Sequence, residues 1–512
     1  MLYNLLKSGL KVLAVDEASG VGGTWYWNRY PGARCDGESM EYSYSFSEEL
    51  QQEWKWEDRY SSQSQILEYI NYVADKFDLR RFIQFNSKVQ SLYYDETTNG
   101  WLITTDSEQT YFARYCIMAT GTLSSVNKPS FEGLDTYKGE SYLTGRWPKH
   151  EVNFKNKTVG VIGTGSSGVQ TIPVIATQAK HLTVFQRTPN YSVPAMNRPL
   201  GDDEIRNIKE NYSYIRKKAR NSEAGVAYPE DGTLKALEVS KDERDHEFQK
   251  RWTRGGVDFI ASFVDIMTNE SANDSAADFV RSKIRNIVDD EKIAELLTPQ
   301  DIIGCKRLCA DTDYYATYNR ENVALIDLSS TPILRFVENG IQTSKETFEL
   351  DAVVFAMGFD AMTGALLGID IKGKSGMSLK DKWVNGPRNY LGISVAGFPN
   401  MFTITGPGSP SVLTNMMTAI EQHIEWVTDC ITFMESSGKK EIEASLDAEK
   451  SWMDHVEEVA LTTLNYGCNS WYLGANIPGK NRIFMPYAGG IPAYTQKCQD
   501  VASSGYSGFN LT

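Results

Sequence analysis

A glycine-rich turn between an apolar strand and a helix is the feature that most restricts the fold of this sequence. Residues 158–162 read TVGVI, which is typical of a buried strand, and Gly163 to Gly168 read GTGSSG. The run VQTIPVIATQ that follows is compatible with a helix, and a second strand, HLTVFQ, ends at Gln186. This order of strand, GxGxxG turn, helix and strand is that of a dinucleotide-binding fold, whereas an isolated GxGxxG would be weak evidence. The glycines let the backbone approach a pyrophosphate at the helix N-terminus, where the helix dipole favours negative charge.

The residues that end the second strand bear on the choice between the two nicotinamide cofactors. A site for NAD usually has Asp or Glu here, because the carboxylate binds the ribose 2′-hydroxyl. This sequence has Gln186, Arg187 and Thr188. A guanidinium pairs bidentately with a 2′-phosphate, so NADP(H) is the predicted nucleotide, and a solvated arginine is the alternative. The residues expected to contact the nucleotide are Gly163, Thr164, Gly165, Ser166, Ser167, Gly168, Arg187 and Thr188.

The N-terminal residues predict part of a second dinucleotide site. Tyr3 to Lys7 read as a helix that Gly9 ends, and Lys11 to Val15 read as a buried strand. Asp16 follows that strand, where it is placed to bind a ribose hydroxyl. No GxGxxG turn stands before the strand. We expect that turn upstream of Met1; a misassigned start codon, a truncation and an unusual mode of binding are three open explanations.

Short apolar strands alternate with helices in two regions, which is typical of an α/β protein with parallel sheets. Apolar spacing predicts a helix at 64–77, and another is expected around 414–434. Residues 115–121 and 351–358 read as buried strands. Between about 200 and 300 charges are dense and Gly and Pro are few, so a helical insertion is predicted there. The predicted fold class is α/β, with two dinucleotide-binding, Rossmann-like domains and the helical insertion in the NADP-binding one.

Composition argues against several classes of partner and cofactor. The formal net charge is −14, which disfavours nucleic acid or an anionic membrane as a partner, and no apolar run is long enough to cross a bilayer. Seven scattered cysteines without a close pair favour a reducing, cytoplasmic compartment over secretion. The five histidines form no metal-binding motif, so no protein-bound metal is expected. A monomer that acts on small molecules is the expected form.

One stretch of the sequence is specific enough to suggest a family. Residues 22–36, GGTWYWNRYPGARCD, strongly resemble Baeyer–Villiger monooxygenases of the cyclohexanone and phenylacetone monooxygenase type. The similarity runs in the family's order from Gly22 to Thr512. It includes RWP (146–148), VGVIGTGSSGVQ (159–170), VFQRTP (184–189), YYATYNRENV (314–323), GPGSPS (406–411) and SWYLGANIPGK (470–480).

The resemblance implies FAD and NADPH as cofactors and a division of the chain. Residues 1–124, without the N-terminal glycine loop, and 360–512 are expected to form the FAD-binding domain, and residues 125–359 the NADP-binding domain. By matching position, Lys306 is expected at the 2′-phosphate and Trp471 near the NADP ribose and nicotinamide. The remaining cofactor contacts expected are Asp16, Gly23, Thr24, Trp25, Tyr26, Trp27, Asp36, Tyr42, Val89, Arg307 and Met416.

The resemblance also implies a reaction. NADPH reduces FAD, the reduced flavin adds O2 to give a flavin peroxide, and the peroxide attacks a ketone to give an ester or lactone. Arg307 matches the family's catalytic arginine, and its charge persists at any working pH, so it suits an anionic oxidant. Asp36 is expected to orient Arg307; a structural ion pair is the alternative for both. The expected lining of the ketone pocket is Ser411, Val412, Leu413 and Thr414.

Two positions depart from the family pattern. The fingerprint Phe-x-Gly-x-x-x-His-x-x-x-Trp-Pro here has Tyr137 in place of Phe and Leu143 in place of His. Leucine neither donates nor accepts a hydrogen bond, so the linker interactions expected between the two domains are affected. Met357 stands where the family usually has Thr in an ATG turn.

Two other functions stay open from the sequence. A flavin monooxygenase that oxidises soft N or S atoms needs a protonated oxidant, which a persistent arginine partner disfavours. A non-catalytic or truncated homologue that binds NADP(H) alone would account for the missing first glycine loop and for Leu143.

Overall fold

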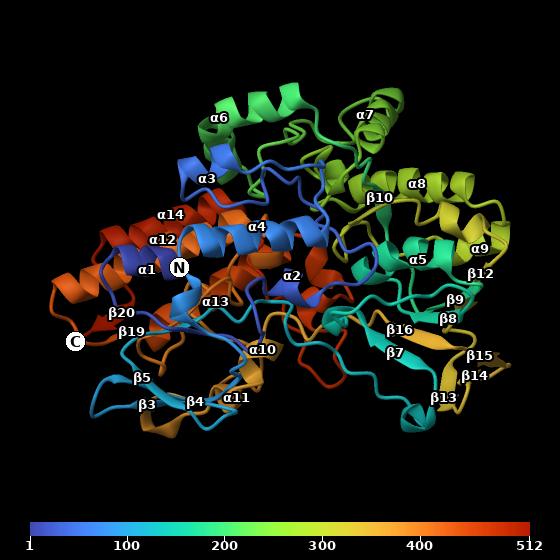
Figure 1. The fold of residues 1–512 in the computed structure, drawn as a ribbon. Coiled ribbons are helices and arrows are strands. Elements are labelled where there is room, and N and C mark those ends of the chain that lie inside the picture. Colours follow the sequence, from blue (N-terminus) through green and yellow to red (C-terminus); the bar gives the residue numbers. More distant parts are fainter.

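The computed structural model describes residues 1–512, and its largest sheet belongs to the predicted NADP-binding unit. The strands lie in the order β12-β9-β8-β16-β7, and every pair is parallel. Helix α5 (Ser166–Gln178) connects β8 to β9 and covers the sheet (Figure 1). The strands are β7 (Glu140–Leu143), β8 (Thr158–Ile162), β9 (His181–Gln186), β12 (Val323–Asp327) and β16 (Ala352–Phe355). The predicted strand–turn–helix–strand unit and the α/β class are confirmed.

The insertion between β9 and β12 is helical, as predicted. Its helices are α6 (Asp202–Arg220), α7 (Lys241–Arg254), α8 (Glu270–Ile287) and α9 (Glu291–Leu297), with a short 3-10 helix η4 (Val257–Ala261). Side chains of Ser240, Asn269 and Asp290 cap α7, α8 and α9, which explains where these helices begin. Strands β10 (Ser192–Pro194) and β11 (Cys309–Asp311) pair in parallel at the two ends of the insertion. This pairing brings residue 190 close to residue 307, although the whole insertion separates them in sequence.

The part of the chain predicted to bind FAD contains two separate pairs of parallel strands. Strand β1 (Ala14–Val15) pairs with β2 (Ile83–Gln84), and β6 (Cys116–Met118) pairs with β18 (Met401–Thr403). The prediction of a buried strand over Lys11 to Val15 was wrong in both length and burial, because only its last two residues have a partner strand and Leu13 is 48% exposed. A buried strand needs backbone partners along its whole length, and an apolar run alone does not supply them.

Two smaller sheets, mostly antiparallel, and C-terminal helices complete the structure. A four-stranded sheet has the order β17-β3-β4-β5, and β13-β14-β15 form a meander beside the NADP-binding sheet. Their bounds are β3 (Val89–Asp95), β4 (Gly100–Thr105), β5 (Thr110–Ala113), β17 (Asp370–Lys372), β13 (Ile333–Val337), β14 (Gly340–Thr343) and β15 (Thr347–Glu349). Helix α1 (Leu2–Lys7) packs beside α12 (Met416–Ser436) and α14 (Gly490–Ser503) through a cluster that includes Leu5, Trp426 and Tyr494 (Figure 1).

The remaining elements are short or connect these layers. They are α2 (Thr24–Trp27), α3 (Glu48–Glu53), α4 (Gln63–Lys76), α10 (Gly364–Leu367), α11 (Leu379–Lys382), α13 (Leu446–Leu461), β19 (Ile442–Ala444) and β20 (Phe509–Leu511). The 3-10 helices η3 (Thr144–Arg146), η7 (Ser411–Leu413) and η9 (Trp471–Leu473) fall in segments that the family resemblance singles out.

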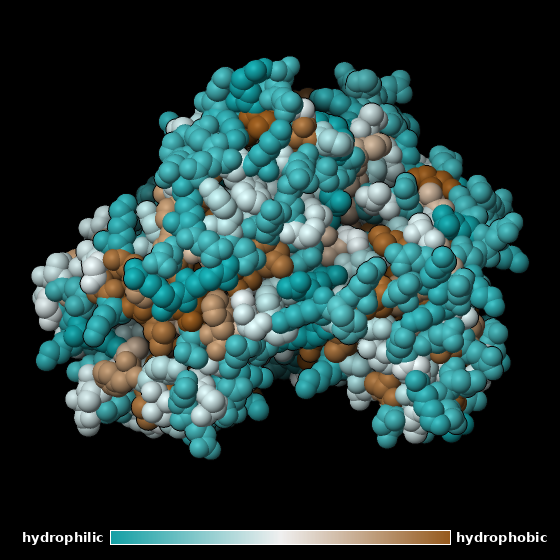
Figure 2. Space-filling model, viewed as in Figure 1, coloured by the Kyte–Doolittle hydropathy of each residue, from teal (hydrophilic) through white to brown (hydrophobic).

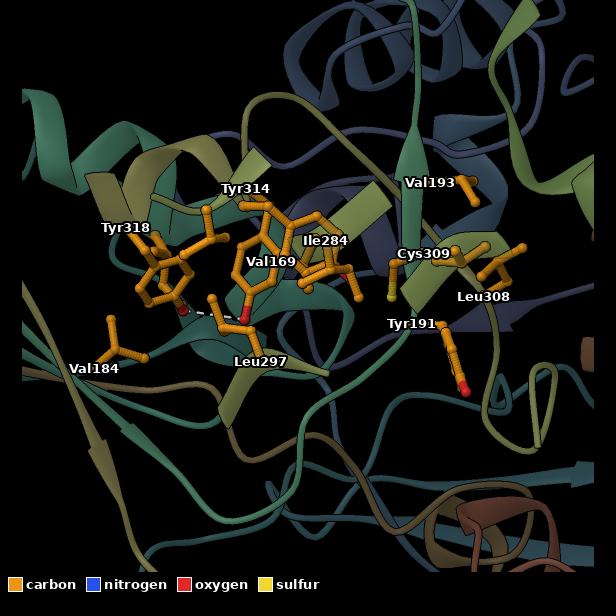
Figure 3. Packing of buried hydrophobic residues seen from close by; sticks show 14 of the residues in the cluster. Val169, Val184, Tyr191, Val193, Ile284, Leu297, Leu308, Cys309, Tyr314 and Tyr318 are labelled. Atoms are coloured by element: carbon orange, nitrogen blue, oxygen red, sulfur yellow. Dashed lines mark hydrogen bonds between the residues drawn. The ribbon is translucent and has the colours of Figure 1, made fainter. Parts of the chain in front are cut away.

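The largest buried apolar cluster surrounds α5 and joins the NADP-binding sheet to the insertion. In Figure 3, Val169 of α5 and Val184 of β9 lie close to Leu297 of α9 and to the hydrogen-bonded pair Tyr314 and Tyr318. The side of the molecular surface shown in Figure 2 is largely hydrophilic, with small apolar patches between polar residues. None of the helices has the length and apolar character needed to cross a membrane. All seven cysteines are free thiols, and no three His, Cys, Asp or Glu side chains meet in a way that could hold a metal ion.

The leucine that replaces the fingerprint histidine sits in apolar surroundings. Leu143 ends β7 opposite Phe355 of β16, and it packs on a buried cluster that contains Ile162 and Phe185. A leucine side chain has no polar group that loses hydrogen bonds to water in this partly buried apolar contact. The leucine therefore matches its local environment.

Candidate functional site

The glycine-rich loop has the geometry that close contact with a pyrophosphate requires. Gly163 has φ +108, and a Cβ there would lie 2.4 Å from the Ala356 carbonyl oxygen. A Cβ at Gly168 would lie 2.3 Å from the Gly163 carbonyl oxygen, so neither position admits a side chain. At Gly165, the N-cap of α5, a Cβ would meet nothing within 4 Å, and no side chain caps the helix. The first N–H groups of α5 are thus available to an anion, and the loop fits a dinucleotide phosphate.

The residues predicted to read the 2′-phosphate lie next to this loop. Thr164 Oγ1 donates to the Thr188 carbonyl at 3.1 Å, which holds the end of β9 against the loop. Gln186 is buried, whereas Arg187 and Thr188 are exposed. Lys306 Nζ lies 3.6 Å from a carboxylate oxygen of Asp301. The structure shows no direct contact between Lys306 and Arg187, so their joint role stays a prediction.

Asp36 and Arg307 form a bidentate ion pair. Arg307 Nε lies 3.0 Å from Asp36 Oδ2, and NH2 lies 2.7 Å from Oδ1, so the guanidinium donates two parallel hydrogen bonds. Its third nitrogen, NH1, donates to the Val412 carbonyl at 3.2 Å. The carboxylate of Asp36 raises the pKa of Arg307 further above its usual value. The arginine side chain is 36% accessible, and the three hydrogen bonds fix the orientation of its guanidinium.

The segment that carries Asp36 is held against the NADP-binding helix. Gln170 of α5 accepts from the Tyr30 hydroxyl at 2.9 Å and donates to the Arg34 carbonyl at 3.0 Å. Gly32 has φ +83, and a Cβ there would lie 2.3 Å from the Gln170 carbonyl oxygen. Only glycine permits this close approach. The contact brings Asp36 to Arg307, 271 residues away in the sequence.

Several of the residues predicted to hold FAD lie in helix α2 or contact it. Trp25 Nε1 donates to the Tyr42 hydroxyl at 3.2 Å, and Gly23, at φ +51, leaves the start of α2 exposed. Asp16 accepts from the Ala18 N–H at 2.8 Å, and burial raises the pKa of its carboxyl. Its carbonyl accepts from the Ser87 N–H, two residues before Val89, which places Val89 near the same end of the site. The carboxylate predicted to bind a ribose and the aromatic residues of α2 therefore both follow β1 in the chain.

Two cations, one in the RWP motif and one directly after it, contact the residues around helix α2. The Arg146 guanidinium lies 3.9 Å from the centroid of the Trp27 ring and also pairs with Glu17. Lys149 donates to the Ser19 hydroxyl at 2.8 Å and lies 4.8 Å from the Tyr26 ring centroid. These contacts tie the linker of the second unit to the predicted flavin segment of the first.

The predicted ketone-pocket segment is mostly buried. Ser411 and Thr414 turn their hydroxyls to Met362 Sδ and to the Ser411 carbonyl, so these side chains are already engaged. Leu413 and Met416 are half-buried beside Val412 in a cluster that includes Trp471, Tyr472 and Phe484. Burial raises the pKa of Tyr472, and the nearby charge of Arg307 partly offsets this. Within the predicted segment, Leu413 is the side chain best placed to line a pocket.

A buried histidine supports the start of this loop. His423 of α12 accepts the Thr405 N–H on Nδ1 at 3.1 Å, and its Nε2 lies 2.7 Å from the Tyr494 hydroxyl. Because that hydroxyl donates to the Leu391 carbonyl, we infer that Nε2 carries the proton and that the ring is neutral. Burial lowers the pKa of His423 to about 4.

We expect this histidine to make the fold sensitive to acid. The unfolded chain takes up the proton below about pH 6.5, whereas the folded chain resists until about pH 4, so stability conferred by the neutral ring is lost as pH falls through this window. The loss amounts to about 3 kcal/mol of unfolding free energy. His423→Gln keeps an acceptor and a donor but does not titrate. Urea unfolding of wild type and of this variant, measured from neutral to acid pH, gives the unfolding free energy of each. The free energy of wild type relative to the variant should fall by about 3 kcal/mol as the pH is lowered. A difference that does not change with pH would contradict the neutral state assigned to His423.

Several contacts of this site were missed from the sequence. Gln170, Arg146 and Cys309 each join segments more than a hundred residues apart, although Gln170 and Arg146 belong to motifs that carry the family resemblance. The position of Gln170, two residues after the last glycine of the loop, was the available signal, because it places the side chain in the first turns of α5. Nothing local identifies its partners.

The fold and the site together define a class. Two dinucleotide-binding units, a glycine loop with an exposed arginine after it, and an oriented arginine–aspartate pair between the units are those of a flavin- and NADP-dependent oxidoreductase. The family model described as "Pyridine nucleotide-disulphide oxidoreductase" matches residues 35–224, in agreement with this class.

Relatives and solved structures identify the family. The chain is 44% identical over 504 residues to a Baeyer–Villiger monooxygenase of Pseudooceanicola batsensis, covering 98% of this chain and 92% of the relative. It is 43% identical to a cyclohexanone 1,2-monooxygenase of Acinetobacter, with the same coverage of both chains. A solved structure of an oxidised steroid monooxygenase bound to NADP is 48% identical, covers 100% of this chain and 96% of its own, and superposes with a TM-score of 0.95.

The chain belongs to the Baeyer–Villiger monooxygenase family. It is an NADPH-dependent, FAD-containing monooxygenase, and the cofactors implied by the sequence resemblance are confirmed. The assignment of individual residues to these cofactors remains a prediction.

Proposed function

We propose that this enzyme converts a ketone to an ester or lactone with NADPH and O2, and that Arg307 and Asp36 carry the reaction. The observation that supports this most is the bidentate pair between them, with the guanidinium also bonded to the carbonyl of Val412, a member of the apolar cluster against which Leu413, Trp471 and Met416 pack. An oriented cation next to apolar side chains suits a neutral carbonyl substrate that gains negative charge during the reaction.

The residues that would hold the cofactors follow from the site. The free N–H groups of α5, with Arg187 and Thr188, would bind NADP, and Asp16, Trp25 and Val89 would bind FAD. When bound, FAD supplies the two-electron chemistry of O2 and the transfer of one oxygen atom. The protein would supply position, charge and the exclusion of water.

Arg307 would stabilise the negative charge that develops on oxygen. Its ion pair with Asp36 fixes the plane of the guanidinium, and the hydrogen bond to the Val412 carbonyl fixes its remaining edge. A group that is already oriented needs no reorganisation when charge appears. Because arginine does not lose its proton at working pH, the site would favour an anionic oxidant, which attacks carbonyl carbon, over a protonated one, which attacks N or S.

Product identification tests this proposal directly. Purified enzyme supplied with FAD and NADPH should consume O2 and convert members of a panel of cyclic, linear and aryl ketones to esters or lactones, detected by mass spectrometry. A thioether included in the panel should give little sulfoxide. Sulfoxide without any ester would assign the enzyme to N- or S-oxygenation, and the absence of any oxygenated product would contradict both functions.

Arg187→Ala should weaken NADPH binding without affecting NADH. Loss of a charged hydrogen-bonding partner of the 2′-phosphate is expected to raise the dissociation constant for NADPH by ~10- to 100-fold. NADH lacks this phosphate, so its affinity should not change. Fluorescence titration with both nucleotides measures the difference, and Arg335→Ala, an exposed arginine of β13, is the matched control. An equal loss of affinity for NADPH and NADH would contradict the assignment of Arg187 to the 2′-phosphate.

The setting of the enzyme is also a proposal. Seven free thiols support a reducing compartment such as the cytoplasm. A monomer with ketone and O2 as its small-molecule partners agrees with a single chain that contributes both Arg307 and Asp36 to the site.

A further inference from the structure

Cys309 has an unusual environment for a buried cysteine. It is 3% exposed on β11, two residues after Arg307, and Figure 3 shows it on its strand beside Val193 and Leu308. A buried free cysteine usually behaves as a small apolar side chain. The Cys309 sulfur instead lies within hydrogen-bonding range of polar atoms from three segments.

The three contacts have one consistent pattern of donors and acceptors. Asn190 Nδ2 donates to the Cys309 sulfur at 3.2 Å, and the Ser166 hydroxyl lies 3.3 Å from it. The thiol itself donates to the Arg307 carbonyl, with the sulfur 3.7 Å from that oxygen. Burial raises the pKa of the Cys309 thiol to about 12, so it keeps the proton that it donates. The sulfur then accepts from both Asn190 and Ser166.

Each partner belongs to a segment with a proposed role. Ser166 is the first residue of α5, at the loop expected to bind the NADP pyrophosphate. Asn190 follows Arg187 and Thr188, the residues expected at the 2′-phosphate. Arg307 carries the proposed catalytic charge. The parallel pairing of Ser192 with Cys309 sets the register that directs the sulfur toward α5.

We propose that Cys309 is a positioning residue that couples nucleotide binding at the glycine loop to the placement of Arg307. The thiol holds the backbone of Arg307, while Asp36 holds its guanidinium, so the arginine is fixed at both ends. A movement of Ser166 or Asn190 would be transmitted to the backbone of Arg307 through the Cys309 sulfur, which contacts all three residues. This inference rests on the proposed function, because it takes the roles of Ser166 and Arg307 from it.

Two substitutions separate hydrogen bonding from packing. Cys309→Ser keeps a donor and an acceptor in a smaller side chain, whereas Cys309→Val fills the space on a strand but forms no hydrogen bond. If the thiol only packs, valine should be tolerated and serine should be harmful, since a buried hydroxyl costs free energy. If the thiol positions its partners, serine should be tolerated and valine should be harmful.

The first readout is the dissociation constant for NADP+, which does not depend on oxygenation. We expect Cys309→Val to raise it about tenfold, the usual size of a lost buried hydrogen bond, and Cys309→Ser to stay close to wild type. In a Ser166→Ala background the effect of Cys309→Val on NADP+ affinity should be smaller than in wild type, because one of the three partners of the sulfur is already gone. Cys430→Val, at a fully buried cysteine of α12, is the control and should not change NADP+ affinity.

The second readout is the ratio of hydrogen peroxide to ester formed per NADPH consumed. It should rise in Cys309→Val and not in Cys309→Ser. Thermal unfolding of each variant shows whether it is folded, and Cys309→Ala replaces valine if that variant does not fold. Wild-type affinity in the valine or alanine variant, with weaker binding in the serine variant, would overturn the proposal. Failure of wild-type ketone oxidation would instead contradict the proposed function, whatever the NADP+ constants show.

Discussion

Arg307→Ala is expected to abolish ester formation while NADPH still reduces the bound flavin. The alanine removes the cation that faces the site, and removal of one preorganised charge-stabilising donor costs ~10²- to 10³-fold in rate. Hydride transfer from NADPH needs the cofactors to be bound and aligned, and none of the residues around the glycine loop is changed. Anaerobic loss of the flavin colour with NADPH measures the first step, and ester yield from a ketone measures the second.

Arg307→Lys is the matched variant, because lysine keeps the charge but loses the planar fork that pairs with Asp36. It should form more ester than the alanine variant and less than wild type. An ester yield near wild type in Arg307→Ala would mean that another group supplies the charge. If flavin reduction were lost as well, Arg307 would act in nucleotide binding and not in oxygen transfer.

Local patterns predicted the elements that have strong periodicity. The helix expected at 64–77 is α4 at Gln63–Lys76, and the strand expected at 158–162 is β8 at Thr158–Ile162. In both, the spacing of apolar residues reports the buried face directly. The strand expected at Lys11 to Val15 is shorter than expected because strand pairing depends on a partner elsewhere in the chain.

Contacts between distant segments could not be predicted from the residues. The family resemblance suggested that Asp36 orients Arg307, and the structure places them in a bidentate pair. Two contacts bring them together: the close approach of Gly32 to Gln170, and the pairing of β10 with β11. Both depend on the packing of segments that are far apart in the sequence. No role for Cys309 could be predicted either, because Ser166 and Asn190, whose polar groups contact its sulfur, lie more than a hundred residues away in the sequence.

The expected behaviour of Asp36→Asn distinguishes an orienting carboxylate from an independent catalytic one. Asparagine has the same shape but no charge, so the guanidinium loses its bidentate partner and its fixed plane. Ester formation should fall ~10²-fold, the size of effect that a misplaced reacting group produces. The protein should also lose about 1–3 kcal/mol of unfolding free energy, since the remaining arginine is only partly solvated.

A double-mutant cycle gives the decisive comparison. If Asp36 acts through Arg307, the Asp36→Asn substitution should cost nothing further in ester formation once Arg307→Ala is present. Additive losses would mean that Asp36 contributes separately, for example through the flavin. Because Asp36 and Arg307 lie 271 residues apart in the sequence, a non-additive result would also show that the fold brings two distant segments together to act as one functional unit.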